Sequence, residues 1–167
     1  MATVLIGPWC AGKSTHGPRL AAETSREFID LDEIMAGYGA EVGWSLDCLI
    51  RRNAEIGMLA SEREWEPTRV HAVERVLADF PDAVIALGAS YTGYTSRGRS
   101  ERVRRALSEH EVVLMTPSDD DGETEVICWK RAIADRGLAW AEDRADFTSW
   151  RPTRLDRQVA DRIVLTG

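Results

Sequence analysis

The sequence predicts an α/β fold of three layers, in which a parallel sheet of five strands lies between two layers of helices. Five short apolar runs lack the polar alternation of half-exposed strands, and such runs are typical of strands buried on both faces. Helical patterns separate these runs, and alternating strands and helices build parallel sheets. The expected strands are residues 3–6, 27–29, 83–87, 112–115 and 162–165.

The helices are predicted from apolar spacing and stop signals. Apolar side chains recur every three or four residues from Val70 to Phe80, and Pro81 marks the end of that helix. The acidic run at residues 119–121 comes just before another helical pattern, so we interpret it as a loop and helix cap, with a metal site as the alternative. The remaining helical patterns cover residues 14–23, 45–59, 103–107 and 123–134.

A glycine-bounded loop follows the first apolar run. Residues 7–14 read Gly-Pro-Trp-Cys-Ala-Gly-Lys-Ser and match the P-loop pattern G-x-x-x-x-G-K-[ST]. In this pattern, backbone N–H groups and the start of the next helix face a polyphosphate, the lysine reaches the β and γ phosphates, and the hydroxyl ligates Mg²⁺. The fold is therefore expected to be that of a P-loop NTPase that binds ATP and Mg²⁺. The expected nucleotide-binding residues are Gly7, Trp9, Cys10, Ala11, Gly12, Lys13, Ser14 and Thr15.

Two carboxylates, Asp30 and Asp32, follow the second predicted strand. One carboxylate can face the Mg²⁺ shell while the other faces a substrate hydroxyl, because neighbouring side chains at a strand end point in different directions. We assign the metal side to Asp30, together with Ser14, and the substrate side to Asp32. The alternative is that Asp32 only caps the helix that follows.

Composition limits the class of protein. The chain has 167 residues, 44% of them hydrophobic, which suits a single domain over residues 1–167. Its net charge of −7 argues against a nucleic-acid partner, and the absence of a long apolar stretch argues against a membrane one. Three cysteines without metal-like spacing favour reduced thiols. We expect a cytoplasmic protein, either a monomer or a weak homodimer, that acts on a small molecule.

The chain resembles the shikimate kinase family of small P-loop kinases. The resemblance depends on residues 7–15, on Asp30-x-Asp32, on Gly88-Ala89-Ser90 after the third strand, and on Arg151-Pro152 near the end. It implies that Asp32 binds and deprotonates the acceptor hydroxyl and that Gly88 and Ala89 line the acceptor pocket. It further implies that Lys13 and Arg136 are catalytic, that Arg136 belongs to a short lid over residues 136–149, and that Arg69 and Arg151 bind the acceptor.

Two departures leave the acceptor open. Arg69 is displaced by a residue or two from the Phe-Arg position of the family, and Ala89 and Ser90 replace two of three glycines. The leading hypothesis is ATP-dependent phosphorylation of a hydroxyl on a small, anionic metabolite, with shikimate the first candidate. The alternatives are a kinase of another acceptor, such as a nucleoside or an antibiotic, and a nucleotide-binding switch without turnover.

Overall fold

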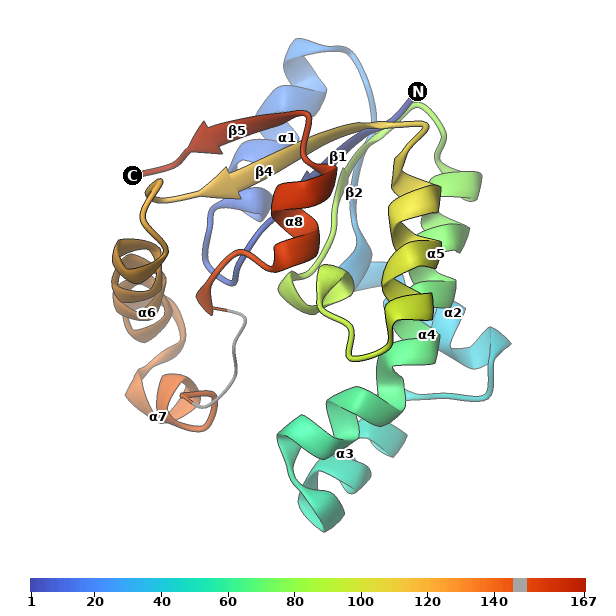
Figure 1. The fold of residues 1–167 in the computed structure, drawn as a ribbon, viewed down its shortest axis with the longest axis vertical. Coiled ribbons are helices and arrows are strands. Elements are labelled where there is room, and N and C mark those ends of the chain that lie inside the picture. Colours follow the sequence, from blue (N-terminus) through green and yellow to red (C-terminus); the bar gives the residue numbers. More distant parts are fainter. Residues whose placement is uncertain (146–149) are drawn as a thin grey trace.

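A computed structural model describes residues 1–145 and 150–167, and its centre is a parallel sheet of five strands in the order β2-β3-β1-β4-β5 (Figure 1). β1 lies in the middle and pairs with β3 on one side and β4 on the other. The phosphate loop therefore leaves the sheet near its centre, where parallel sheets bind ligands. The strands are β1 Thr3–Ile6, β2 Phe28–Asp30, β3 Val84–Ala86, β4 Glu111–Thr116 and β5 Arg162–Leu165.

Helices cover both faces of this sheet. α1 packs on β1, β2 and β3 from one side, where Leu5 and Met115 join its buried residues. The other face carries a larger core, in which residues of β1 and β4 pack against α4, α5 and α8. The expected three-layer fold is confirmed. The helices are α1 Lys13–Glu23, α2 Leu31–Glu41, α3 Leu46–Ile56, α4 Met58–Asp79, the 3-10 turn η1 Ala89–Thr92, α5 Arg97–Leu107, α6 Asp121–Arg136, α7 Leu138–Glu142 and α8 Arg154–Val159.

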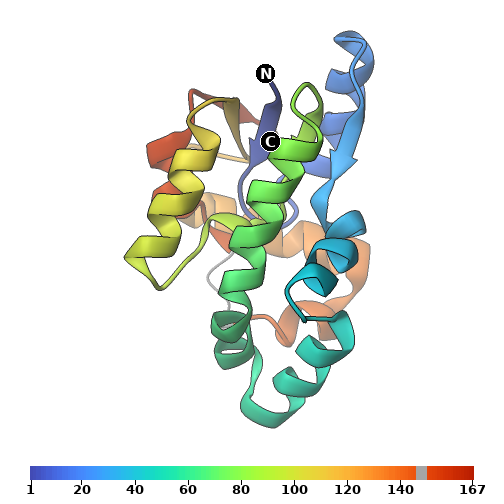
Figure 2. The same ribbon diagram turned by 90° about the vertical axis from the view of Figure 1, so that its right-hand side faces the viewer.

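The helix expected over residues 45–59 is wrong in its extent. α3 ends at Ile56, and α4 begins at Met58 after Gly57, whose φ of 83° and ψ of 159° break the helix. α4 then runs without interruption through Pro67 to Asp79 (Figure 2). The torsions of Gly57 are ones that glycine adopts without strain. As a result, Arg69 lies near the middle of one long helix that extends from the sheet toward α3.

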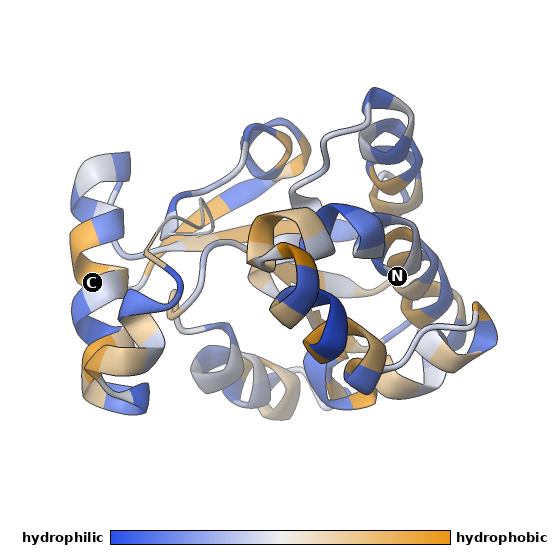
Figure 3. Ribbon diagram, turned by 90° about the horizontal axis from the view of Figure 1, so that it is seen from below, coloured by the Kyte–Doolittle hydropathy of each residue, from blue (hydrophilic) through white to orange (hydrophobic). Residues whose placement is uncertain are grey.

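The acidic run caps a helix, as expected. Asp120 accepts a hydrogen bond from the Glu123 backbone N–H at 2.8 Å, at the start of α6. The helices mix hydrophobic and hydrophilic residues along their length (Figure 3), which suits elements with one buried face. None of the described helices is long and apolar enough to cross a membrane.

The predicted lid begins at the end of α6. Gly137, with φ 90°, separates Arg136 from the short helix α7. Residues 146–149 of the predicted lid lie outside the described residues. Where the chain is described again, Trp150 is buried beside Cys128 of α6.

Candidate active site

The phosphate loop has the backbone shape that its glycines predict. Gly7 has φ 132°, and a Cβ there would lie 2.2 Å from the carbonyl oxygen of Met115, which is backbone and cannot turn away. Gly12 has φ 92° and precedes α1 without a capping side chain, so the first N–H groups of the helix stay available for an anion. Gly7 shapes the loop, whereas the expected residues from Trp9 to Thr15 line the cleft in front of it.

Lys13 is folded into this loop. Its Nζ donates hydrogen bonds to the carbonyl oxygens of Gly7 and Pro8, each at 2.8 Å. The side chain is buried, and burial lowers the pKa of Lys13 while the carboxylate of Asp32 opposes that shift. The two hydrogen bonds to carbonyl oxygens hold the ammonium inside the loop.

Two residues far away in the sequence, Arg131 and Thr166, hold the loop and line the same cleft. The Arg131 guanidinium of α6 donates to the carbonyl oxygens of Cys10, at 3.3 Å, and Thr166, at 2.5 Å. The Thr166 hydroxyl in turn donates to the carbonyl oxygen of Ala11 at 2.8 Å. Sequence reasoning missed both residues, because nothing in their local pattern marks them. Burial raises the pKa of the Cys10 thiol, which disfavours a reactive thiolate in the loop.

The two aspartates have different positions. The Ser14 hydroxyl donates to one oxygen of Asp30 at 2.8 Å, and the other oxygen accepts from the Asp32 backbone N–H at 3.1 Å. Asp30 is thus the N-cap of α2, and the alternative that Asp32 is the cap is wrong. Asp32 instead lies in the first turn of α2, and its side chain lines the cleft.

Charged groups surround the Asp32 carboxylate. Burial raises the pKa of Asp32 and the neighbouring Asp30 raises it further, whereas Lys13 and Arg136 lower it. Tyr91 lowers the pKa of Asp32 as well. The carboxylate therefore shares the cleft with two cations and a like charge, which is the setting of a group that handles protons or metal-bound phosphates.

One cleft of about 410 Å³ brings these groups together. It contains the predicted loop residues from Trp9 to Thr15, both aspartates and Arg136, although they come from three separate segments of the chain. Gly88 and Ala89 close it on the side of β3. Gly88 fits tightly, since a Cβ there would lie 2.5 Å from an Asp32 carboxylate oxygen and 2.7 Å from the Tyr91 ring.

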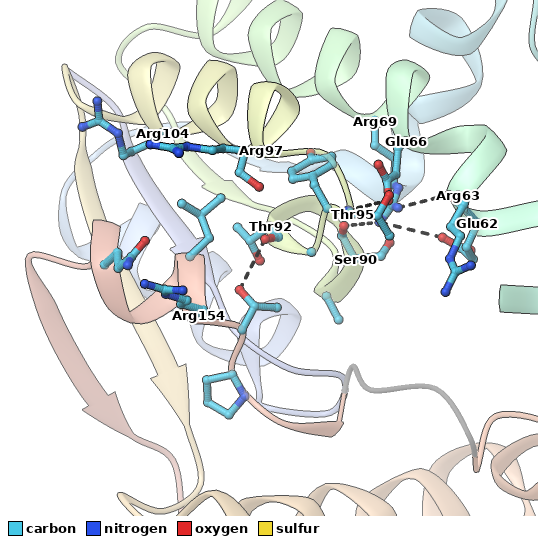
Figure 4. A pocket seen from close by; sticks show the side chains of 18 of the residues that line it. Glu62, Arg63, Glu66, Arg69, Ser90, Thr92, Thr95, Arg97, Arg104 and Arg154 are labelled. Carbon is cyan, nitrogen blue, oxygen red and sulfur yellow. Dashed lines mark hydrogen bonds and ion pairs between the residues drawn. The ribbon is translucent and has the colours of Figure 1, made fainter. Parts of the chain in front are cut away.

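A second, larger cleft has a volume of about 1240 Å³ (Figure 4). Ala89 lines both clefts. Arg69 lines the larger cleft and is buried, with only 4% of the residue exposed. Its guanidinium donates to the carbonyl oxygens of Ser90 and, at 3.2 Å, Glu62, and it also lies 3.8 Å from the Glu62 carboxylate. Its Nε has no hydrogen-bond partner among the described residues. Arg69 therefore reaches the predicted acceptor side in spite of its displacement in the sequence.

Arg151 lies at the rim of the same cleft. Its guanidinium is paired with Glu125 of α6, and 57% of its side chain is exposed. In Figure 4, Arg97 and Arg104 of α5 and Arg154 of α8 line the end of the cleft away from α4. The structure thus places both predicted acceptor arginines on one cleft, although Arg69 and Arg151 differ greatly in burial.

The hydroxyl-rich residues 91–95 hold their own backbone. The Tyr94 hydroxyl donates to the carbonyl oxygen of Tyr91 at 2.7 Å, and the Thr95 N–H donates to Glu66 at 2.8 Å. Glu66 is buried and also pairs with Arg99 at 2.7 Å. These contacts fix the turn after β3 to α4.

The beginning of the lid packs on the phosphate loop through aromatic rings. Trp9 lies 5.4 Å, centroid to centroid, from both Trp140 and Trp150. The Arg136 guanidinium stacks over the Trp140 ring at 4.6 Å, a distance typical of cation–π contacts. Arg136 therefore lines the nucleotide cleft from the segment in which the sequence places a lid.

Comparison with known proteins gives a consistent picture. The family model for shikimate kinase matches residues 9–121. A shikimate kinase of Chromohalobacter salexigens is 56% identical over 112 residues, which are 66% of this chain and 52% of the relative. The shikimate kinase of Pseudoalteromonas atlantica is 31% identical over 180 residues, with 96% of this chain and 92% of the relative covered. The chain thus spans about half of the first relative and nearly all of the second.

Solved structures agree on the fold. The shikimate kinase from Acinetobacter baumannii in complex with shikimate matches with a TM-score of 0.62 at 18% identity, over 99% of this chain and 83% of that one. The shikimate kinase from Bacteroides thetaiotaomicron gives a TM-score of 0.56 at 19% identity, over 99% and 85% of the two chains. The family model includes both aspartates and Gly88, and one relative aligns over almost the whole chain, so the chain belongs to the shikimate kinase family, as its resemblance predicted.

Proposed function

We propose that this protein transfers the γ-phosphoryl group of ATP to a hydroxyl of shikimate. Members of its family are ATP-dependent kinases with an alcohol acceptor. The observation that carries the proposal is the junction of two clefts at Ala89. One cleft holds the phosphate loop and the other holds buried Arg69, with Asp32 lining the first beside Gly88. A phosphate donor and an anionic acceptor can meet at that junction.

The nucleotide side provides positive charge and backbone donors. The N–H groups at the start of α1 would bind the phosphates, and the Lys13 ammonium would turn from the loop carbonyls to the transferred group. Arg136 would contribute a second cation from the lid side. Phosphoryl transfer requires little covalent chemistry from the protein, so positioning and neutralisation of charge dominate its catalysis.

The oxygens of Ser14 and Asp30 suit Mg²⁺. They lie 2.8 Å apart at the mouth of the loop, and Mg²⁺ prefers a few protein oxygens together with phosphates and water. The described residues include no cluster of three or more His, Cys, Asp or Glu side chains that could hold a metal ion. When bound, Mg²⁺ would neutralise phosphate charge. Ser14 and Asp30 would hold it, and Asp30 keeps its role as the cap of α2.

The acceptor side provides a base and anion-binding groups. Asp32 would orient the acceptor hydroxyl and take its proton. Gly88 and Ala89 would lie against the acceptor, and the guanidinium groups of Arg69 and Arg151 would attract its carboxylate. Each arginine already has a carboxylate neighbour, Glu62 for Arg69 and Glu125 for Arg151. The Arg151 side chain is far more exposed, so it can turn from Glu125 toward the acceptor more easily than the buried Arg69 can turn from Glu62.

The setting of the protein is part of the proposal. The net charge of −7 supports a protein without a nucleic-acid partner. We propose that it acts in the cytoplasm, as a monomer or a weak homodimer. Size-exclusion chromatography with light scattering would measure the oligomeric state.

The test is a coupled assay of ATP consumption with a panel of hydroxylated compounds that includes shikimate, a nucleoside and an aminoglycoside. We expect shikimate to be the preferred acceptor. Asp32→Asn keeps the size of the side chain but removes its charge, and should lower kcat by roughly 10²-fold. Asp47→Asn, on the exposed start of α3, is the matched control and should keep the wild-type rate.

Two results would contradict the proposal. Preferred turnover of a neutral acceptor would refute shikimate as the substrate while keeping the kinase assignment. Consumption of ATP that no acceptor stimulates would refute the transferase activity itself.

A further inference from the structure

The 3-10 turn η1 is held from several sides. The Tyr91 backbone N–H donates to the carbonyl oxygen of Gly88 at 3.1 Å, and its own carbonyl oxygen accepts from the Tyr94 hydroxyl at 2.7 Å. Arg69 donates to the carbonyl oxygen of Ser90, and the Thr153 hydroxyl donates to that of Thr92 at 3.3 Å (Figure 4). The backbone of η1 is therefore fixed by α4 on one side and by the start of α8 on the other.

This fixed turn places the Tyr91 side chain against Asp32. Only 4% of Tyr91 is exposed, and its ring lies next to the Asp32 carboxylate on either side of Gly88. A Cβ added at Gly88 would lie 2.7 Å from the Tyr91 ring and 2.5 Å and 2.9 Å from the two carboxylate oxygens of Asp32. Ring, glycine and carboxylate are thus in tight contact, and a larger residue at position 88 would separate them.

The carboxylate needs such a restraint. The cations Lys13 and Arg136 line the same cleft as this carboxylate, and so does the like-charged Asp30. A free aspartate side chain would rotate toward the cations. Its acid–base work requires an oxygen within hydrogen-bond reach of the acceptor hydroxyl. Nothing else in the local sequence of α2 holds the carboxylate in one orientation.

We propose that Tyr91 is a positioning residue, whose hydroxyl holds one oxygen of Asp32 so that the other faces the acceptor. The inference rests on the proposed function and adds a residue to its site. Burial raises the pKa of Tyr91, and the charge of Asp32 raises it further, so the hydroxyl stays protonated and can donate throughout the working pH range. The fixed turn makes this donor rigid, and a rigid second group limits the misplacement of the first.

The test compares Tyr91→Phe with Tyr38→Phe. Both substitutions remove one hydroxyl that binds an aspartate, because the Tyr38 hydroxyl donates to Asp79 at 3.0 Å far from the clefts. Tyr91→Phe should lower kcat with shikimate about ten-fold, the rate equivalent of one hydrogen bond to a charged group. The KM values for ATP and shikimate should stay within about two-fold, since binding contacts remain. Tyr38→Phe should keep the wild-type kcat.

A double-mutant cycle separates positioning from a structural effect. In the Asp32→Ala background, Tyr91→Phe should cause no further loss of kcat, because the group that it positions is gone. A loss of kcat that is equal in both backgrounds would overturn the inference. So would a wild-type kcat for Tyr91→Phe alone.

Failure of the proposed function looks different. If Asp32→Ala abolishes turnover and Tyr91→Phe does not change it, only the inference about Tyr91 is wrong. If the wild-type protein phosphorylates another hydroxyl compound in place of shikimate, the substrate assignment is wrong. The same ratios of kcat, measured with that compound, then decide the role of Tyr91.

Discussion

Gly88→Ala tests the tightest contact in the site. Gly88 has φ −60° and ψ 157°, which any residue adopts, so the effect of a methyl group would be purely steric. Its Cβ would lie 2.5 Å from an Asp32 oxygen, about 0.9 Å short of ordinary contact at 3.4 Å. The Tyr91 ring, at 2.7 Å, blocks the other direction. Either the carboxylate or the ring must therefore move by nearly an ångström.

A shift of that size has a calculable effect. Misplacement of a catalytic group by about 1 Å costs roughly 10²-fold in rate, and overpacking of a filled site costs about 1–3 kcal/mol of stability. We therefore expect kcat to fall by about 10²-fold and the free energy of unfolding in urea to fall by about 2 kcal/mol. Affinity for ADP, measured by calorimetry, should not change, because the three atoms nearest to that Cβ belong to Asp32 and Tyr91 and not to the phosphate loop.

Gly37→Ala is the matched control. Gly37 lies inside α2, and a Cβ there would meet nothing within 4 Å. Alanine should stabilise the helix by about 0.5–1 kcal/mol and leave kcat unchanged. A Gly88→Ala variant with the wild-type kcat would show that Asp32 does not depend on this contact, and would refute the reasoning.

Three further predictions concern charge. Lys13→Ala should lower turnover by at least about 10²-fold with the fold retained in circular dichroism, and near wild-type activity would defeat the kinase assignment. Arg151→Lys should raise the KM for shikimate several-fold and leave that for ATP unchanged, because lysine lacks the bidentate fork, whereas an equal change in both would place Arg151 elsewhere. Glu66→Gln removes the ion pair with Arg99 and should destabilise the protein by about 2 kcal/mol. The loss should be smaller than for breaking a fully buried ion pair, because Arg99 is partly exposed. Burial alone would raise the pKa of Glu66, but its hydrogen bonds with Thr95 and Arg99 outweigh it and hold the pKa below 4.5. The stability difference should thus be constant above that pH and shrink as the pH falls through the lowered pKa; a difference independent of pH would contradict the ion pair.

Local patterns predicted the phosphate loop and the strands well. The loop depends on torsions at Gly7 and Gly12, which neighbouring residues in the sequence determine. The strands β1, β3 and β4 depend on burial over three to six residues, whereas the edge strand β5, also expected to be buried, is mostly exposed. The extent of α3 could not be predicted in the same way, because Gly57 breaks the helix through its torsions while the residues on both sides keep a helical pattern.

Contacts between distant segments could not be predicted from the sequence. Arg131 and Thr166 support the phosphate loop from positions more than 100 residues away. Tyr91 meets Asp32 only because β2 and β3 are neighbours in the sheet. The alternative that Asp32 caps α2 was wrong, since either aspartate fits the pattern of a cap and only the backbone geometry at Asp30 decides. Pairing in the sheet and the ends of helices therefore determine much of this site.

The aromatic packing around the phosphate loop gives the protein a built-in optical reporter. Trp9 belongs to the loop itself, and its ring contacts those of Trp140 and Trp150. Indole emission responds to neighbouring rings and charges, so arrival of a nucleotide at the loop should change the fluorescence of this cluster. Trp44 and Trp65 form a separate stacked pair, 6.4 Å apart, between the end of α2 and α4. Replacing that pair with phenylalanine would leave emission from the nucleotide side alone, and binding could then be followed in real time without a label.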